Sequence, residues 1–174
     1  MPTRSRVVLR PPVAADAAPF LAMVRESRRL HRPWVHPPAD EKAFLMFVQR
    51  STSERYVGRL VCLRGTEDIV GAISLSEVVR GVFQSAYLSY YGSARHAGKG
   101  LMREGLLLFL GHAFRALKLH RVEANIQPEN VRSVALVRSL GFHQEGFSPR
   151  YLKISGRWRD HERWALLAED WRRR

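Results

Sequence analysis

Arg95-His96-Ala97-Gly98-Lys99-Gly100-Leu101 is the stretch that decides the fold, because it joins a predicted strand to a predicted helix through two closely spaced glycines. The start of a helix presents backbone N–H groups without partners and the positive end of the helix dipole. Glycines let that backbone approach an anion with no side chain in between. Lys99 and Arg103 add positive charge to the same segment. These features predict a diphosphate-binding loop, and on these residues alone a plain strand-to-helix turn remains the alternative.

A Walker A phosphate loop is the obvious rival for this segment. That loop needs Ser or Thr directly after its Gly-Lys pair, where the hydroxyl holds magnesium. Gly100 occupies this place, and Gly92 is one residue too far upstream to be the first glycine of the motif. We therefore reject a P-loop nucleotide site.

The pattern before this loop predicts two helices and four strands. Asp16 is expected to cap the first helix, and three prolines between Leu30 and Pro38 predict a loop after it. The second helix is expected from about Asp40. The apolar residues of the first helix share one face: Phe20, Leu21 and Val24. The expected strands are Val7–Arg10, Tyr56–Leu63, Ile69–Val79 and Ser85–Tyr91.

The pattern after the loop predicts two more helices and three more strands. A long helix should run from Leu101 to about Leu117, and a second from Val131 to Leu140. Asn130 suits the cap of the second helix and Gly141 suits its stop. The expected strands are Arg121–Ile126, Phe142–Ile154 and Arg157–Leu167. This order predicts a mixed α+β fold in a single domain, residues 1–174.

The composition limits the classes of protein that the chain fits. Its 174 residues carry a formal net charge of +13, which suits either solubility or attraction to anions such as a phosphorylated cofactor, RNA or the ribosome. No apolar run is long enough to span a bilayer, so we expect a cytoplasmic protein with no membrane contact. Cys62 is the only cysteine, and its apolar surroundings indicate a core residue. The seven histidines form no metal-ligand motif, so we expect no metal.

Two motifs together resemble the GCN5-related N-acetyltransferase (GNAT) superfamily. Arg95 to Gly100 is similar to the acetyl-CoA loop of that family, and Asn130-Val131-Arg132-Ser133 followed by Leu140-Gly141-Phe142 is similar to its second signature. Further stretches resemble the ribosomal-protein-alanine N-acetyltransferases of the RimJ and RimL type. These are Arg32-Pro33-Trp34, Val78-Val79-Arg80-Gly81, Gly98-Lys99-Gly100-Leu101-Met102, Tyr151-Leu152-Lys153-Ile154 and Gly156-Arg157-Trp158-Arg159-Asp160-His161. The resemblance implies the GNAT fold, with a mostly antiparallel mixed sheet of about seven strands and about four flanking helices.

The resemblance implies a binding site for acetyl-CoA, the co-substrate. Backbone amides near Leu88 or Ser89 would polarise the thioester carbonyl, as in an oxyanion hole. Ser133, one helical turn after Asn130, would meet the thioester sulfur. The residues expected to contact acetyl-CoA are Tyr87, Leu88, Ser89, Tyr90, Arg95, His96, Ala97, Gly98, Lys99, Gly100, Leu101, Asn130 and Ser133.

The catalytic residues implied by the resemblance are Tyr151, Ser133, Glu123 and Asn125. Tyr151 would donate a proton to the leaving thiolate, although a core tyrosine is the alternative. Asn125 stands where many relatives carry a glutamate base, and it can only orient water. Glu123 lies on the same strand face and would act through water or simply pair with an arginine. We expect direct attack by the amine in a ternary complex, because an α-amino group with a pKa near 8 is already about one tenth neutral at pH 7.

The acceptor site is expected at the loop that holds Arg32 and Trp34, with Trp34 packing on an entering N-terminus or tucked into the core. The leading hypothesis is acetylation of a protein N-terminus, for example that of a ribosomal protein. A small amine, such as an antibiotic or polyamine, is the alternative acceptor, and carboxylates in the acceptor cleft would favour it. A ribosome- or RNA-binding module without turnover is the hypothesis from another class. Ribosome association and a homodimer are both left open.

Overall fold

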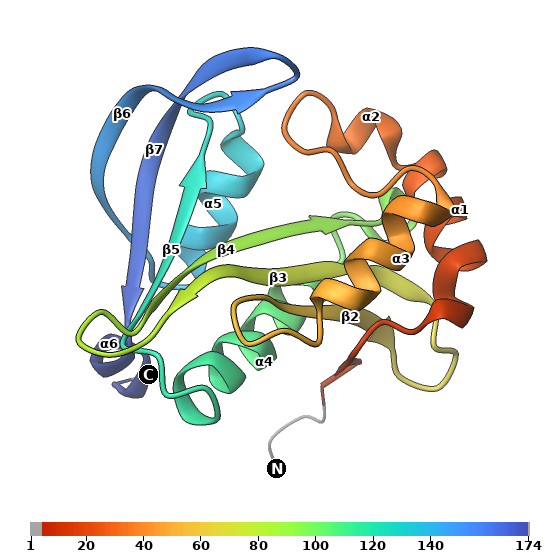
Figure 1. Cartoon of the computed structure of the whole chain (residues 1–174), viewed down its shortest axis with the longest axis horizontal. Helices are drawn as coiled ribbons and strands as arrows, with labels where there is room; N and C mark the ends of the chain where they lie inside the picture. The colour runs from red at the N-terminus through yellow and green to blue at the C-terminus, as the bar shows by residue number, and fades with distance from the viewer. Residues whose placement is uncertain (1–4, 174) are drawn as a thin grey trace.

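The computed structural model describes residues 5–173, and within them one seven-stranded sheet forms the centre (Figure 1). Residues 1–4 and 174 of the expected domain lie outside the described residues. The strands are β1 Val7–Arg10, β2 Val57–Leu63, β3 Ile69–Val79, β4 Ser85–Gly92, β5 Arg121–Ile126, β6 His143–Ile154 and β7 Arg157–Leu167. Their spatial order is β1-β2-β3-β4-β5-β7-β6. β4 and β5 pair in parallel, whereas the other neighbours pair antiparallel.

Four helices of nine or more residues flank this sheet, which confirms the expected fold. They are α1 Ala17–Glu26, α3 Glu41–Arg50, α4 Leu101–Arg115 and α5 Val131–Ser139. Two shorter helices, α2 Arg28–His31 and α6 Ala168–Arg172, complete the part of the chain that the structure describes. Asp40 caps α3 through its side-chain oxygen, 2.8 Å from the backbone nitrogen of Ala43, and Gly141 follows α5 with a φ of 79°.

Two hydrophobic cores lie on the two faces of the sheet. Alternate residues of β2 point to opposite faces, because side chains alternate along a strand. Leu60 and Cys62 therefore pack with Phe20 of α1 and Phe44 of α3, whereas Val61 packs with α4 on the other face. The buried Cys62 is one of these small core residues, as its surroundings in the sequence indicated.

The sheet opens where β4 and β5 separate. Only three residue pairs join the two strands, from Ser85–Arg121 to Tyr87–Glu123. Beyond Tyr87, β4 continues to Gly92 beside β3 without a partner on its other side. Every second backbone N–H and C=O of this free stretch therefore points into the gap between the strands. This gap places an unpaired strand edge next to α5 and the start of α4, as Figure 1 shows.

Two expectations about individual residues are wrong. Asp16 does not cap α1; its carboxylate accepts hydrogen bonds from the Arg10 guanidinium, at 2.8 and 2.6 Å, and from the N–H of Val13, at 2.8 Å. Burial raises the pKa of Asp16, but these hydrogen bonds hold it below its ordinary value. The expected loop from Leu30 begins only after His31, because α2 adds one turn.

Two findings concern other classes of site within residues 5–173. No helix there is both long enough and apolar enough to cross a membrane. Among the same residues, no three or more His, Cys, Asp or Glu side chains come together in a way that could hold a metal ion.

Candidate functional site

A cavity of about 970 Å³ lies at the opening between β4 and β5. Its walls come from α2, the end of β4, the glycine loop with the first turn of α4, and the first turn of α5. Nine residues expected at the site from the sequence line it: Trp34, Tyr90, His96, Ala97, Gly98, Gly100, Leu101, Asn130 and Ser133. Segments far apart in the chain thus meet at one cavity, and both sequence motifs contribute to its wall.

The glycine loop presents bare backbone to this cavity. Gly98 and Gly100 both have a φ of 75°, a conformation that favours glycine. A Cβ atom at Gly98 would meet no other atom within 4 Å, so the space beside it is open. The backbone N–H groups from Gly98 to Arg103 have no hydrogen-bond acceptor within residues 5–173. A row of free donors at the positive end of a fifteen-residue helix is suited to bind an anion such as a diphosphate.

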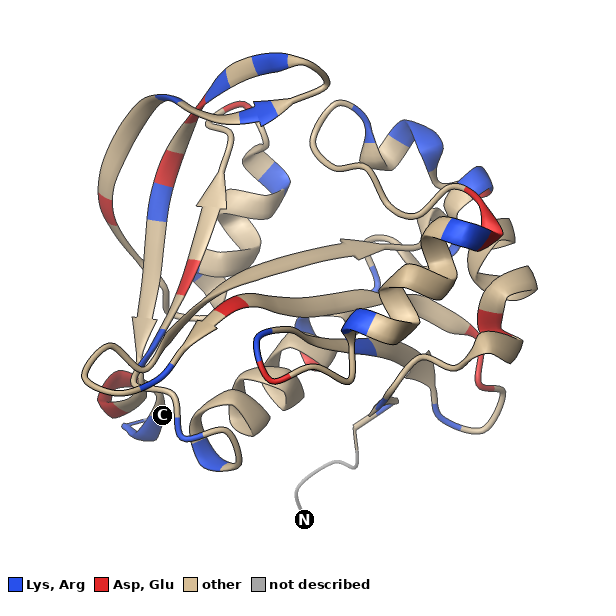
Figure 2. Cartoon of the chain, in the orientation of Figure 1, with Lys and Arg blue, Asp and Glu red and all other residues tan. Residues whose placement is uncertain are grey.

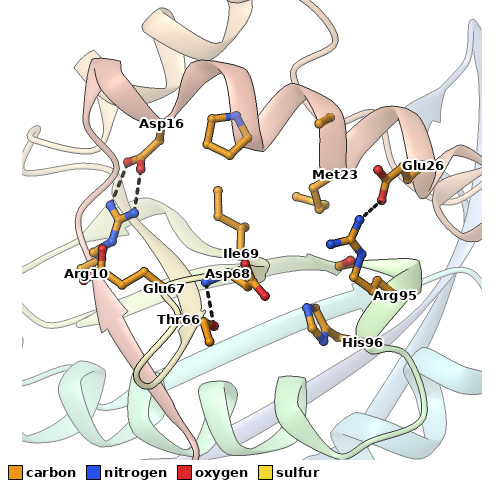
Figure 3. Close-up of a pocket in the computed structure, with 13 residues that line it drawn as sticks. Arg10, Asp16, Met23, Glu26, Thr66, Glu67, Asp68, Ile69, Arg95 and His96 are labelled. Carbon is orange, nitrogen blue, oxygen red and sulfur yellow. Dashed lines mark hydrogen bonds and ion pairs between the residues drawn. The ribbon is translucent and has the colours of Figure 1, made fainter.

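The charged side chains of this loop are used differently from the expectation. Arg95 turns away from the cavity and donates to Glu26 of α1, with its Nη2 3.3 Å from Oε2 (Figure 3). Arg103 lines the cavity and reaches Ser139 at 3.3 Å. Lys99 does not line the cavity, and its carbonyl accepts from Arg6 at 2.9 Å. Backbone groups, rather than these cations, therefore dominate the loop surface that faces the cavity.

Tyr90 and Ser133 join the two sides of the opening. The Tyr90 phenol lies 2.6 Å from the Ser133 hydroxyl, across the gap between β4 and α5. Burial raises the pKa of Tyr90 to about 12, despite its hydrogen bond with Ser133, which lowers it. Tyr90 thus keeps its proton at neutral pH. Asn130 accepts from the Ser133 N–H at 3.3 Å, so its side chain caps α5 while it lines the cavity.

The other expected β4 residues and Tyr151 lie outside the cavity wall. The Leu88 side chain is buried in the core, which leaves only its backbone for contact with a ligand. Tyr87 and Ser89 are exposed on the face opposite Leu88. Burial raises the pKa of Tyr87, and the neighbouring Tyr151 phenol raises it further. Tyr151 also packs edge-on against His161, with ring centroids 6.2 Å apart.

The two residues expected near the base position differ in what they contact. Glu123 accepts from Arg121, 2.7 Å away, and Arg121 also pairs with Glu145. This ion pair holds the Glu123 carboxylate close to Arg121. The side-chain oxygen of Asn125 is buried and has no hydrogen-bond partner within the described residues. An orphaned buried acceptor is unusual, and it marks Asn125 as a place where a donor from water or from a substrate would fit.

His31 is a site residue that sequence reasoning did not single out. Its Nε2 lies 2.8 Å from the carbonyl oxygen of Gly92, so that nitrogen carries the proton. The opposite nitrogen, Nδ1, is buried without a partner in the described part of the chain. Burial lowers the pKa of His31, although the bond to Gly92 raises it. Because the two residues are 61 positions apart, no local pattern could have revealed this contact.

On the acceptor side, Trp34 lines the cavity as expected, whereas Arg32 is exposed outside its wall. Leu30, Val35 and Arg29 complete this side of the wall.

Comparison with known proteins identifies the family. The acetyltransferase (GNAT) domain family matches residues 6–143. The probable N-acetyltransferase YjcK of Bacillus subtilis is 32% identical over 94% of this chain and 95% of its own length. The ribosomal protein uS5-alanine N-acetyltransferase of Escherichia coli is 34% identical over 97% of this chain and 91% of its own. The structure of Mycobacterium smegmatis RimJ in complex with CoA-disulfide superimposes with a TM-score of 0.86, at 30% identity, over 94% of this chain and 83% of the other. The chain therefore belongs to the GNAT family and is an acetyl-transferring enzyme.

Proposed function

We propose that this enzyme transfers the acetyl group of acetyl-CoA to the N-terminal α-amino group of a protein. The row of free backbone donors from Gly98 to Arg103 is the observation that supports acetyl-CoA as the donor of the acetyl group. The charge of the cavity wall is the observation that supports a protein N-terminus, rather than a polyamine, as the acceptor. The uS5-alanine acetyltransferase of E. coli, with 34% identity, adds support for a ribosomal protein as the acceptor.

Acetyl-CoA fits the cavity in two respects. The donors at the start of α4 would bind its diphosphate, and the glycines leave room for the phosphate oxygens. The free edge of β4 from Leu88 to Gly92 would pair with the amide groups of the pantetheine arm. The acetyl end would then lie in the opening between β4 and β5. There a backbone N–H of β4 would stabilise the oxygen of the tetrahedral intermediate.

Ser133 is proposed to contact the thioester sulfur. The Tyr90 hydroxyl lies 2.6 Å from the Ser133 hydroxyl oxygen and 3.4 Å from the Ser133 carbonyl oxygen, and we propose that it donates its hydrogen to the Ser133 hydroxyl. That donation occupies the serine oxygen and leaves the serine hydrogen free to turn toward the sulfur. The amine nitrogen bonds to the carbonyl carbon to form the tetrahedral intermediate, and collapse of this intermediate breaks the C–S bond. The proton that the nitrogen loses neutralises the departing thiolate. The proton-donor role expected for Tyr151 stays a prediction.

The amine itself needs only modest help to lose its proton. Glu123 is engaged by Arg121, so we propose that Asn125 positions a water or the amine through its unpartnered oxygen. An α-amino group with a pKa near 8 is about one tenth neutral at pH 7, whereas a lysine side chain is far less so. Holding the neutral amine beside the thioester supplies much of the remaining rate enhancement.

The charges around the cavity disfavour a polyamine acceptor. The part of the wall that comes from α2 and the loop after it carries Arg29 and no carboxylate, whereas Glu129, the one carboxylate of the lining, lies just before α5. A polyamine carries several positive charges and needs carboxylates to bind them. Carboxylates gather instead in a separate cavity of about 410 Å³, which Figure 3 shows. Its acidic residues are Asp16, Glu26, Glu67 and Asp68, of which the first two pair with arginines.

The test is release of the CoA thiol with three acceptors. The first is a peptide with a free N-terminal alanine and no lysine. The second is the same peptide with a blocked N-terminus and one internal lysine, and the third is spermidine. We expect turnover with the first peptide alone, and mass spectrometry should place the acetyl group on its α-nitrogen. Turnover with spermidine alone would overturn the proposal, and tight acetyl-CoA binding without turnover on any amine would favour a binding module.

A further inference from the structure

We propose that the enzyme selects protein N-termini that are followed by acidic residues, which cations at the mouth of the acceptor cavity recognise. This inference rests on the proposed function and names the class of acceptor. The cations are Arg28, Arg29 and Arg32 on one side, and Arg150, Lys153, Arg157 and Arg159 on the other. These seven residues are called the basic mouth below.

The two sides of the basic mouth meet in space although they are far apart in the sequence. The His36 Nε2 atom lies 2.6 Å from the Ser155 hydroxyl, which joins the loop after α2 to the turn between β6 and β7. Figure 1 shows this loop and this turn approaching each other above the opening between β4 and β5. Trp34 and Val35, which precede His36, line the cavity. A peptide whose N-terminus lies in the cavity would therefore leave it close to both sides of the mouth.

The cations of the basic mouth have no counter-charge of their own. All seven are exposed, and none forms an ion pair within residues 5–173. Figure 2 shows basic residues gathered on α2 and around the β6–β7 turn. Asp160 is the one carboxylate from Ser148 to His161, and it accepts from the backbone N–H of Arg150 at 2.7 Å. Glu26, beside α2, pairs with Arg95.

Some arginines elsewhere in the fold have carboxylate partners, although others, such as Arg25 and Arg50, form no ion pair within residues 5–173. Arg6 pairs with Glu104, Arg10 with Asp16, Arg55 with Glu77, and Arg121 with both Glu123 and Glu145. The cations of the mouth lack such partners, so no paired carboxylate offsets their charge within residues 5–173. Like charges held together repel one another, and an anion between them removes that repulsion.

A peptide fits this surface better than a nucleic acid. An extended chain advances about 3.3 Å per residue, so side chains a few residues after the acetylated amine would reach the mouth. Arg29 lines the cavity, and Lys153 and Arg157 flank the Ser155 turn that meets the loop after α2, which ties their role to the acceptor. Leu152 and Trp158, 38% and 60% exposed on the same hairpin, add apolar contacts for the peptide backbone and side chains.

The test compares three peptides that share an N-terminal Ala-Ala-Ala and differ in the next three residues: Glu-Asp-Glu, Gln-Asn-Gln or Lys-Lys-Lys. We expect kcat/KM for the acidic peptide to exceed that for the neutral peptide about 10- to 100-fold at low salt. At 0.5 M salt, a concentration at which the Debye length falls to roughly 4–5 Å, the ratio should drop below about threefold.

A pair of charge-reversed variants locates the effect. Lys153→Glu/Arg157→Glu should remove the acidic preference and favour the lysine peptide. Arg115→Glu/Lys118→Glu, an equal change of charge at exposed positions at and after the end of α4, should keep the wild-type ratio. The ratio of acidic to neutral kcat/KM is the quantity compared in each enzyme, so a loss of overall rate does not obscure it.

The outcomes separate this inference from the proposed function. Equal rates on acidic and neutral peptides, or the same ratio in the mouth variant as in wild type, would overturn the inference while the acetylation of N-termini stands. No turnover on any of the three peptides would overturn the proposed function itself. Binding of a single-stranded RNA oligonucleotide that depends on Lys153 and Arg157, with no peptide preference, would assign the mouth to nucleic acid instead.

Discussion

The two halves of the cavity are built in different ways. The cofactor half consists mainly of backbone: the glycine loop, the first turn of α4 and the free edge of β4. The proposed acceptor half is lined by side chains of α2 and the loop after it, and this loop meets the β6–β7 turn at His36 and Ser155. The first half offers backbone donors, which do not depend on the identity of a side chain, whereas the second offers side chains, whose charge and size depend on the sequence.

This difference indicates which part of the cavity determines the choice of acceptor. Backbone donors bind a diphosphate whichever amine is acetylated, so changes in the loop should affect every acceptor alike. Changes in the acceptor half should alter the ranking of acceptors and leave acetyl-CoA affinity nearly unchanged. Kinetics that separate these two effects can therefore confirm the division or break it.

The largest effect is expected for Gly98→Glu in the cofactor half. The new carboxylate would project beside the free N–H groups and repel the diphosphate, and a φ of 75° strains any side chain. We expect acetyl-CoA affinity, measured by calorimetry, to fall at least about 100-fold. Gly81→Glu is the matched control, because Gly81 has a φ of 69° and open space around it in the β3–β4 turn. Unchanged affinity in Gly98→Glu would refute the phosphate site.

A smaller effect is expected for Tyr90→Phe, where the two halves meet. Without the phenol, the Ser133 hydroxyl loses a partner 2.6 Å away and its orientation is no longer fixed. We expect kcat to fall about 10- to 100-fold, with acetyl-CoA affinity changed less than about threefold. Tyr151→Phe is the companion variant in the same assay. A greater loss of kcat in Tyr151→Phe than in Tyr90→Phe would indicate that Tyr151, the proton donor expected from the sequence, contributes more to turnover than Tyr90.

The contrast between the halves also explains what the sequence could predict. The glycine loop, the Asn130 cap and the Gly141 stop each depend on neighbours a few residues away, so local patterns predicted them. Asp16 looked like a helix cap for the same local reason. The guanidinium of Arg10 competes for its carboxylate, and this bond is visible only once β1 lies beside α1.

Contacts across long sequence separations could not be predicted in this way. Tyr90 meets Ser133 across 43 residues, and His36 meets Ser155 across 119. Glu123 shows this limit of prediction most clearly, because the sequence left two roles open for it: a base that acts through water, or the partner of an arginine. Arg121, two residues away on the same strand face, forms the ion pair with Glu123. Glu145 of β6 pairs with the same arginine, and the sequence pattern did not predict this second contact.

The smallest effect is expected for the pH dependence of His31, which ties α2 in the acceptor half to the end of β4. Burial lowers the pKa of His31 in the folded protein, whereas the unfolded chain has an ordinary value near 6.5. Below that value the unfolded chain binds a proton that the folded protein does not, so stability falls as the pH falls. Above about pH 6.5, His31 is mostly uncharged in both the folded and the unfolded chain, so its effect on the pH dependence of stability ends there.

Urea unfolding at pH 5, 6 and 7 measures this dependence. His31 can contribute at most about 1.4 kcal/mol per pH unit to the slope of unfolding free energy against pH. His31→Asn should flatten the slope and lower stability by about 1 kcal/mol at pH 7, because the Gly92 carbonyl loses its donor. His96 and His112, whose pKa values burial also lowers, keep part of the slope in the variant. A slope that does not change in His31→Asn would show that His31 titrates alike in the folded and unfolded states, and would contradict the effect of burial on its pKa.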